Sequence, residues 1–170
     1  MKTAIIGTGN LGRSIAKGLI INNAITSLYL TRRSLDNLKE FDGYKNVHLT
    51  TDNSLAVQQS DILIFAVQPA HLQSILESVA PHLTEKHIVI STITGFSISK
   101  IENIVGAQHH IIRAMPNTAI AVGKSMTCLC CNTAGKGRVS VAEAIFNRLG
   151  ATICIPEEQM QAATVVCASG

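Results

Sequence analysis

The sequence predicts an α/β protein with a doubly wound, mainly parallel sheet. Strand and helix patterns alternate along most of its 170 residues, which is typical of parallel strands joined by crossover helices. Hydrophobic residues make up 46% of the chain and charged residues only 15%, as expected for a sheet that helices bury on both faces. A glycine-rich turn also lies between the first predicted strand and the first predicted helix.

The amino-terminal strand, turn and helix predict a dinucleotide site. The apolar run Ala4–Ile6 precedes the turn, and Leu11, Ile15 and Leu19 follow at helical spacing. The turn itself reads Gly7-Thr8-Gly9-Asn10-Leu11-Gly12. Its three glycines permit a tight bend, close approach of a pyrophosphate, and close packing of helix on strand, while the helix N-terminus offers N–H groups to the phosphate. Because these parts occur in the required order, the pattern favours a Rossmann-like cofactor site over a glycine turn without a ligand.

Further β-α units follow along the chain. Apolar runs predict strands at 28–30, 47–50, 62–67, 88–90 and 111–112. Apolar residues at helical spacing predict intervening helices at 35–38, 55–57, 72–79 and 98–105. The expected helix boundaries are Asp52 and either Ser97 or Ser99 as N-caps, Pro69 as a first helical residue and Gly106 as a stop.

The pattern changes after Met115-Pro116-Asn117. Segments 119–122 and 126–131 are close in sequence and predict an antiparallel addition to the sheet. A helix over 141–149, a strand over 151–155 and a helical stretch from Glu157 are expected next. The predicted organisation is therefore a dinucleotide-binding domain over residues 1–156, with 157–170 as the start of a further helix.

Composition argues against several other classes of protein. The net charge of +3 is small, and aromatic residues make up 4% with no Trp, so nucleic acid is not an expected partner. The apolar runs are too short to cross a membrane, and the first strand begins too close to Met1 for a leader peptide, so we expect a cytoplasmic protein. Cys128, Cys130 and Cys131 lie in a strand pattern and are expected as buried apolar residues, with no metal site.

The end of the second predicted strand indicates which cofactor is bound. NAD is usually held there by an acidic side chain on the ribose 2′-hydroxyl, whereas a 2′-phosphate requires a cation. Here the strand end reads Thr31-Arg32-Arg33-Ser34, and the first acidic residue is Asp36. Since guanidinium groups and hydroxyls suit a phosphate dianion, we expect NADPH to be preferred over NADH. The alternative is that Arg32 and Arg33 are a solvated surface pair.

Other strand ends should line the same crevice. They carry small and apolar residues, which suit a flat nicotinamide ring, in the runs Ala66-Val67-Gln68-Pro69, Ser91-Thr92-Ile93-Thr94-Gly95 and Ala114-Met115-Pro116-Asn117. Asn117 could bind the carboxamide or a substrate, or could simply be a turn residue after proline. His71 follows the first of these runs and could reach the cofactor.

Together these segments resemble pyrroline-5-carboxylate reductase, the NAD(P)H-dependent enzyme of the last step of proline synthesis. The glycine turn, Ala66–Pro69 and Ser91–Gly95 match family motifs, and Arg113-Ala114-Met115-Pro116-Asn117-Thr118 is the most specific match. Glu157, Thr164 and Ser169-Gly170 resemble the start of the motif that leads into the family's second domain. The chain departs from the family pattern at Gln68, Gln161 and Cys167-Ala168, where the family usually has Lys, Asp and Ser-Gly.

The resemblance implies NADPH-dependent reduction of a cyclic imine, 1-pyrroline-5-carboxylate, to L-proline. It implies that Gly7–Gly12 bind the pyrophosphate, that Arg32, Arg33 and Ser34 bind the 2′-phosphate region, and that Asn53 lies near the adenosine. Nicotinamide and ribose contacts are implied for Ala66, Val67, Gln68, Pro69, Thr92, Ile93 and Thr94. Substrate contacts are expected at Asn117 and Glu157, and no residue is assigned as the catalytic acid.

In the family, the chain continues into a helical domain that dimerises and supplies most of the substrate pocket. The present sequence therefore looks like the cofactor half of such an enzyme. One alternative is an NADP(H)-binding module without turnover of its own. Another is a related F420-dependent NADP oxidoreductase, which shares the glycine fingerprint.

Overall fold

The computed structural model describes the backbone of residues 1–169 and the side chains as far as Val165. The sequence features noted at Cys167-Ala168 and Ser169-Gly170 concern side chains outside these described residues.

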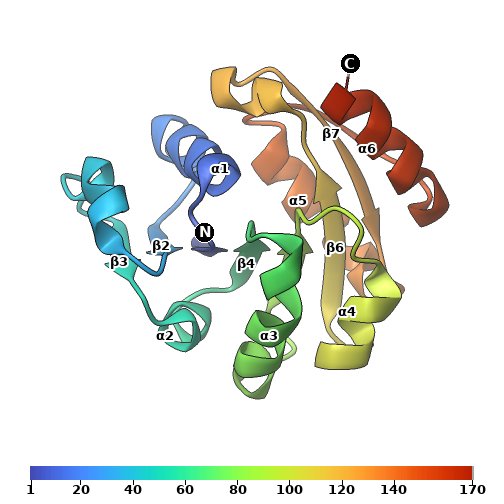
Figure 1. Ribbon diagram of the computed structural model, residues 1–170, viewed down its shortest axis with the longest axis horizontal. Helices are drawn as coiled ribbons and strands as arrows, with labels where there is room; N and C mark the ends of the chain where they lie inside the picture. Colours follow the sequence, from blue (N-terminus) through green and yellow to red (C-terminus); the bar gives the residue numbers. More distant parts are fainter. Residues whose placement is uncertain (170) are drawn as a thin grey trace.

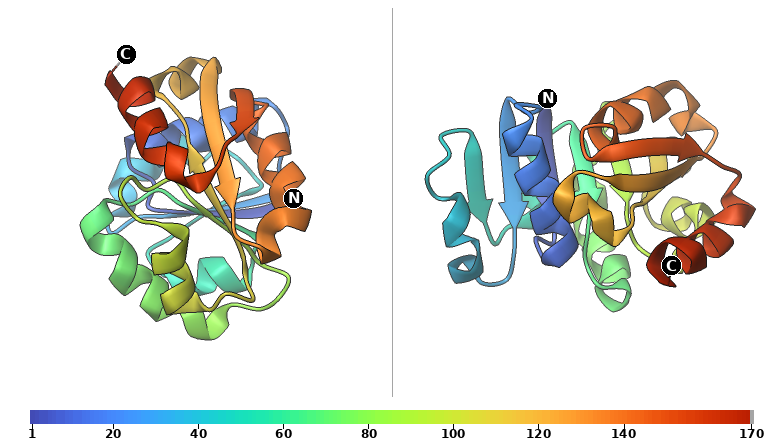
Figure 2. Two further views of the ribbon diagram at one scale, coloured as in Figure 1. Left: turned by 90° about the vertical axis from the view of Figure 1, so that its right-hand side faces the viewer. Right: turned by 90° about the horizontal axis from the view of Figure 1, so that it is seen from above.

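The described chain forms one eight-stranded sheet in the order β3-β2-β1-β4-β5-β6-β7-β8. Only β6 and β7 are antiparallel neighbours. The predicted doubly wound, mainly parallel sheet with one antiparallel addition is therefore confirmed (Figures 1 and 2). The strands are β1 (Lys2–Ile6), β2 (Ser27–Thr31), β3 (Val47–Thr50), β4 (Ile62–Phe65), β5 (Ile88–Ser91), β6 (His110–Met115), β7 (Ser125–Cys131) and β8 (Gly150–Cys154).

Helices cover both faces of the sheet. The α-helices are α1 (Asn10–Ile21), α2 (Asn53–Gln58), α3 (Pro69–Val79), α4 (Ile98–Val105), α5 (Val139–Phe146) and α6 (Met160–Ser169). The short 3₁₀ helices are η1 (Leu35–Phe41), η2 (Ala80–His82), η3 (Thr118–Val122), η4 (Ala134–Arg138) and η5 (Glu157–Gln159). Helices α1, η1 and α5 pack on one face, and α2, α3, α4 and the start of α6 on the other. Figure 1 shows α1 opposite α2 and α3 across the strands.

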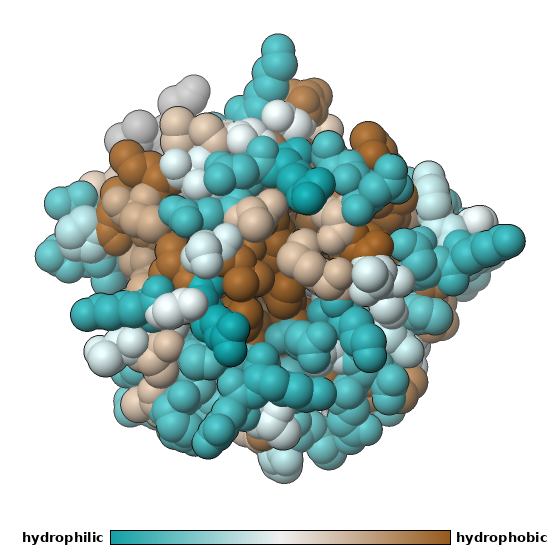
Figure 3. Space-filling model, turned by 180° about the vertical axis from the view of Figure 1, so that it is seen from behind, coloured by the Kyte–Doolittle hydropathy of each residue, from teal (hydrophilic) through white to brown (hydrophobic). Residues whose placement is uncertain are grey.

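Alternation along the strands divides the core between these two faces. The buried apolar side chains form two clusters, one on each face of the sheet. In β1, Ile5 belongs to the cluster under α1, η1 and α5, whereas Ala4 and Ile6 belong to the cluster under α2, α3 and α4. Successive side chains of a strand face opposite sides of a sheet, so strands covered on both faces must be apolar throughout, as the sequence of β4 is. Figure 3 shows the face opposite that of Figure 1, where hydrophobic residues gather near the centre and hydrophilic side chains surround them. No helix within the described residues is long and apolar enough to cross a membrane.

The predicted helix boundaries follow from short-range chemistry. The Asp52 carboxylate accepts the N–H groups of Ser54 and Leu55 at 2.8 and 3.1 Å, and so caps α2. Ser97, the first of the two predicted candidates, accepts the Lys100 N–H and caps α4. Pro69 begins α3 as predicted, and Gly106 ends α4 with a φ of +98°.

The prediction of a strand at 119–122 is wrong. This segment forms η3, in which the Asn117 carbonyl accepts the Ile120 N–H at 3.1 Å, and Gly123 ends the turn with a φ of +68°. Ile120 is buried in the cluster that includes α1, and η3 packs against that helix. The antiparallel partner of β7 is instead β6, with Ile112 opposite Cys131.

Candidate functional site

A cleft lies at the carboxyl ends of the parallel strands β2, β1 and β4, where the order of the strands in the sheet reverses. β2 and β4 flank β1 on opposite sides, and this arrangement is the usual ligand position in a doubly wound fold. The cleft has a volume of about 550 Å³. We call it the nucleotide cleft, and its lining is Ile6, Gly7, Thr8, Gly9, Thr31, Arg32, Arg33, Ser34, Thr51, Asn53, Ala66, Val67, Gln68, His71, Ser74 and Ile75.

The glycine turn leaves room for a ligand at one position only. A Cβ on Gly7 would meet the Val67 side chain and the Ala66 carbonyl, and Gly7 has a φ of +91°. A Cβ on Gly12 would lie 2.6 Å from the Gly7 carbonyl oxygen. By contrast, no neighbouring atom lies within 4 Å of the Cβ position of Gly9. Gly7 and Gly12 therefore permit the fold of the turn, and Gly9 leaves the backbone accessible.

The amino end of α1 is suited to an anion. Gly9 is its N-cap residue and supplies no side-chain acceptor, and the first turn contains no acidic residue. The first N–H groups of a helix have no acceptor within it, and the helix dipole adds positive potential at this end. These features fit the pyrophosphate of a dinucleotide.

The ends of β1 and β2 are joined by hydrogen bonds beside the cleft. Thr31 Oγ1 accepts the Gly7 N–H at 3.2 Å, and the Thr31 carbonyl accepts the Thr8 N–H at 2.9 Å. Arg32 Nη1 donates to the Thr8 carbonyl at 3.2 Å, while Arg33 and Ser34 are exposed. No Asp or Glu is among the described residues that line this cleft. Its ionic character therefore comes from the two arginines.

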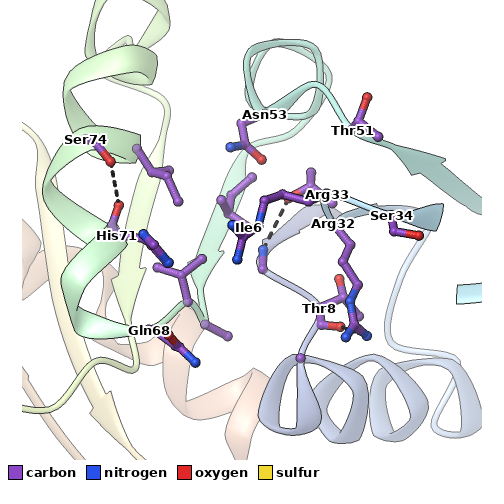
Figure 4. Close-up of a pocket in the computed structure, with 16 residues that line it drawn as sticks. Ile6, Thr8, Arg32, Arg33, Ser34, Thr51, Asn53, Gln68, His71 and Ser74 are labelled. Atoms are coloured by element: carbon purple, nitrogen blue, oxygen red, sulfur yellow. Dashed lines mark hydrogen bonds between the residues drawn. The ribbon is translucent and has the colours of Figure 1, made fainter. Parts of the chain in front are cut away.

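The opposite wall comes from β4 and α3. Figure 4 shows Gln68, His71 and Ser74 on one side of the cleft, with Thr8, Arg32 and Ser34 on the other. The structure thus places His71 in the lining, as the sequence suggested. Thr31 also lines the cleft, at the strand end whose hydroxyls were expected near the phosphate. The lining residues that the sequence did not indicate are Ile6, Thr51, Ser74 and Ile75. Ile6 and Thr51 could have been found from their position at strand ends, whereas the position of Ser74 and Ile75 depends on how α3 packs.

Some predicted cofactor residues lie outside this lining. Asn10, Leu11 and Gly12 form the first turn of α1, and Pro69 begins α3. Thr92 and Ile93 are buried, and Thr92 Oγ1 donates to the Phe65 carbonyl at 2.8 Å. They anchor the loop that follows β5 on the end of β4.

A second pocket, here called the side pocket, lies beyond that loop. Its volume is about 560 Å³, and its lining is Thr94, Gly95, Ser97, Arg113, Glu157, Glu158, Gln161, Thr164 and Val165. Arg113 is only 6% exposed, and its Nη1 lies 3.0 Å from Glu157 Oε1. Among the predicted site residues, Thr94 and Glu157 are brought together here. The sequence indicated Arg113 only as the first residue of the motif at 113–118 and gave it no role in the site.

Asn117 lines neither of these pockets. It precedes η3, and its N–H donates to Ser125 Oγ at 3.2 Å. Its Oδ1 is buried with no hydrogen-bond partner among the described residues. The amide oxygen is therefore left without a hydrogen bond within the described part of the chain.

The cysteines of β7 are not poised for nucleophilic chemistry. Cys128 and Cys130 are buried, as the strand pattern predicts, whereas Cys131 is only half-buried. Burial raises the pKa of the Cys130 thiol to about 12, although the nearby Arg113 lowers it. The thiol therefore stays protonated near neutral pH, and a protonated thiol is a poor nucleophile.

The doubly wound sheet, the glycine turn and the nucleotide cleft define a dinucleotide-binding domain of the oxidoreductase class. The family model described as "NADP oxidoreductase coenzyme F420-dependent" matches residues 2–95. The chain belongs to this family. The description of the family corresponds to the F420-dependent NADP oxidoreductases, which the sequence analysis gives as an alternative.

The resemblance to pyrroline-5-carboxylate reductases is also confirmed. The chain is 40% identical to pyrroline-5-carboxylate reductase 1 of Dictyostelium discoideum over 98% of its own length and 33% of that protein. A pyrroline-5-carboxylate reductase structure from Coxiella burnetii superposes with a TM-score of 0.93 at 34% identity, covering 99% of this chain and 64% of that one. The Plasmodium falciparum pyrroline carboxylate reductase, solved with NADP bound, gives a TM-score of 0.87 at 27% identity, with 98% and 62% covered. The chain thus spans between a third and two thirds of these relatives.

Proposed function

We propose that this chain binds NADP(H) in the nucleotide cleft and, in the whole protein, serves the reduction of 1-pyrroline-5-carboxylate to L-proline. The proposal depends mainly on one observation. A single cleft is bordered by the open amino end of α1 and by Arg32 and Arg33, and its described lining contains no carboxylate. A 2′-phosphate is attracted by guanidinium groups and would be repelled by an acid. The relative from P. falciparum that was solved with NADP supports this choice of cofactor.

The cleft suggests an orientation for the cofactor. The pyrophosphate would lie against Gly9 and the first-turn N–H groups of α1. Arg33 and Ser34 are exposed and would reach the 2′-phosphate, with Asn53 near the adenosine. The nicotinamide end would then point toward Ala66–Pro69 and the loop Thr92–Thr94.

For the chemistry, bound NADPH supplies a hydride, and the protein contributes position and electrostatics. A protonated imine accepts hydride well because the transfer neutralises a positive charge. The side pocket contains Thr94 together with the carboxylates of Glu157 and Glu158, so we place the imine beside this pocket. Asn117 is proposed on the same substrate side, through its unpaired Oδ1. The resemblance further implies a cytoplasmic protein that forms homodimers or higher oligomers through the family's helical domain.

The cofactor proposal is tested by titrating residues 1–170 with NADPH and with NADH in a calorimeter. We expect tighter binding of NADPH, and we expect the double substitution Arg32→Ala and Arg33→Ala to reduce that preference at least about tenfold, because charge-assisted hydrogen bonds to the 2′-phosphate are lost. Lys39→Ala is a matched control, since Lys39 is an exposed cation paired with Asp36.

Two results would contradict this proposal. If the folded wild-type chain binds neither reduced cofactor, the nucleotide cleft is not a cofactor site. If the wild-type chain binds both cofactors but the double variant keeps the wild-type preference for NADPH over NADH, Arg32 and Arg33 do not bind the 2′-phosphate. Binding without turnover in the whole protein would instead favour an NADP(H)-binding module.

A further inference from the structure

The carboxylate of Glu157 joins three elements that are distant in the sequence. Its Oε1 accepts the backbone N–H of Ile98 at 2.6 Å and a hydrogen bond from Arg113 Nη1 at 3.0 Å. Glu157 lies in η5, just before α6, whereas Ile98 begins α4 and Arg113 lies in β6. One side chain therefore connects the segment after β8 to the start of α4 and to β6.

The contact with Ile98 completes the amino end of α4. Ser97 caps this helix by accepting the Lys100 N–H, which leaves the Ile98 N–H to be satisfied by another group. Glu157 provides that acceptor and places a negative charge at the positive end of the helix dipole. The loop 92–97 ends at this point, so its carboxyl end is held by Glu157.

The contact with Arg113 lies beside the strand pair from which the same loop begins. Arg113 is paired in register with Ser91, the last residue of β5, and the loop begins at the next residue. Arg113 as a residue is 6% exposed, and its Nε has no hydrogen-bond partner among the described residues. A guanidinium buried to this extent depends strongly on its carboxylate partner. Glu157 therefore holds the carboxyl end of the loop 92–97 directly, and it neutralises the buried arginine of the strand that pairs with β5, from which the loop begins.

We infer that Glu157 is a positioning residue that holds the loop 92–97 in place for the nicotinamide half of the cofactor. This inference rests on the proposed NADP(H) function and sharpens the sequence expectation for Glu157, which placed it near the substrate. The adenosine half would lie at the ends of β2 and β3, in the nucleotide cleft, whose lining does not include loop 92–97. Loss of Glu157 should consequently affect the two halves of the cofactor unequally.

The test compares two ligands on residues 1–170: NADPH, and 2′,5′-ADP, which lacks the nicotinamide half. For Glu157→Ala we expect NADPH to bind about five- to tenfold more weakly, as for loss of a hydrogen bond to a charged group, while 2′,5′-ADP binds within about twofold of wild type. The change in NADPH fluorescence on binding should also shrink at saturation. Glu157→Gln retains a carbonyl oxygen for the Ile98 N–H and should give a smaller effect. Glu85→Ala, which removes an exposed carboxylate outside both pockets, is the control.

The outcomes separate this inference from the function on which it rests. If the wild-type chain binds neither ligand, the cofactor proposal fails. If the wild-type chain binds both, the inference fails when the Glu157 variants weaken both ligands equally or leave both unchanged. Should Glu157→Ala not fold, the same comparison with Glu157→Gln decides the question. Selective loss of NADPH affinity and of its fluorescence change supports the positioning role.

Discussion

His87 is a buried histidine whose surroundings define its protonation state. It is 1% exposed, and its Nδ1 accepts the Thr84 N–H at 2.8 Å. Since Nδ1 is the acceptor, the proton of the neutral ring belongs on Nε2, which lies 3.3 Å from the Val57 carbonyl. Burial lowers the pKa of His87 below 6.5. Protonation would place a proton on Nδ1, directly facing the Thr84 N–H.

We therefore predict that the protein loses stability as the pH falls below 6.5. With the folded pKa depressed, the unfolded chain binds more protons in the window between the folded pKa and the ordinary value of 6.5. Stability is full above that window and declines as the pH falls through it. Urea unfolding at a series of pH values measures this slope. His87→Asn keeps a side-chain acceptor but does not titrate, so its curve should be flatter; an unchanged slope would assign the effect to other groups.

Residue-scale chemistry was the most predictable part of this molecule. The cap at Asp52, the start of α3 at Pro69 and the stop at Gly106 depend on neighbours within a few residues, so the sequence contains all the necessary information. The partners of Glu157 were not predictable, because Ile98 and Arg113 approach it only after the sheet has formed.

At the scale of elements, Asn132 connects α4, β6, β7 and η4. Its Oδ1 accepts the N–H groups of Ile111 and Gly135, at 3.1 and 2.7 Å. Its Nδ2 donates to Glu102 and to the carbonyls of Ala107 and His109. The side chain is 6% exposed, so these groups have little access to water if it is removed.

Substitution of Asn132 should be strongly destabilising. Asn132→Ala removes the side-chain acceptor of the buried Ile111 N–H and leaves the Gly135 N–H only the longer bond to the Asn132 backbone carbonyl, at 3.2 Å. It should cost about 2–5 kcal/mol. Asn132→Asp should be at least as harmful near neutral pH, because it places a carboxylate against Glu102 and two carbonyl oxygens. Denaturant unfolding checks both variants, with Asn147→Ala as the exposed control. A loss below about 1 kcal/mol for Asn132→Ala would show that this network contributes little.

The sequence also predicted most elements, and its failure at 119–122 has an identifiable cause. Strands such as β4 are apolar throughout and are buried on both faces, which gives a strong signal. The run Ala119–Val122 is also apolar, but only Ile120 is buried, against the cluster that includes α1, while Ala121 and Val122 are exposed. An apolar run of this length does not by itself distinguish a strand from a helical turn. The sequence correctly indicated an antiparallel strand near the carboxyl end, but the pairing of β7 with β6 depends on the whole sheet.

At the scale of the whole molecule, the nucleotide cleft and the side pocket differ in how they are built. The nucleotide cleft is lined from both sides, by the ends of β1 to β3 and by β4 with α3. The side pocket is lined by the loop after β5, by Arg113 and by residues from 157 onward. The relatives from C. burnetii and P. falciparum extend well beyond the matched region, since this chain covers 64% and 62% of them. Cofactor binding is therefore expected from residues 1–170 alone, whereas substrate reduction is expected to require the additional part that such relatives carry.

This difference predicts the behaviour of two polypeptides. Residues 1–170 should bind NADPH but oxidise it slowly, if measurably, in the presence of 1-pyrroline-5-carboxylate, because the substrate is held from one side only. A fusion of residues 1–170 to the remaining segment of pyrroline-5-carboxylate reductase 2 of D. discoideum, which is 36% identical over 98% of this chain, should oxidise NADPH and form proline. The same fusion with Gly7→Val should be inactive, because a side chain there collides with Val67 and Ala66. Rapid turnover by residues 1–170 would instead show that the side pocket already contains a sufficient substrate site.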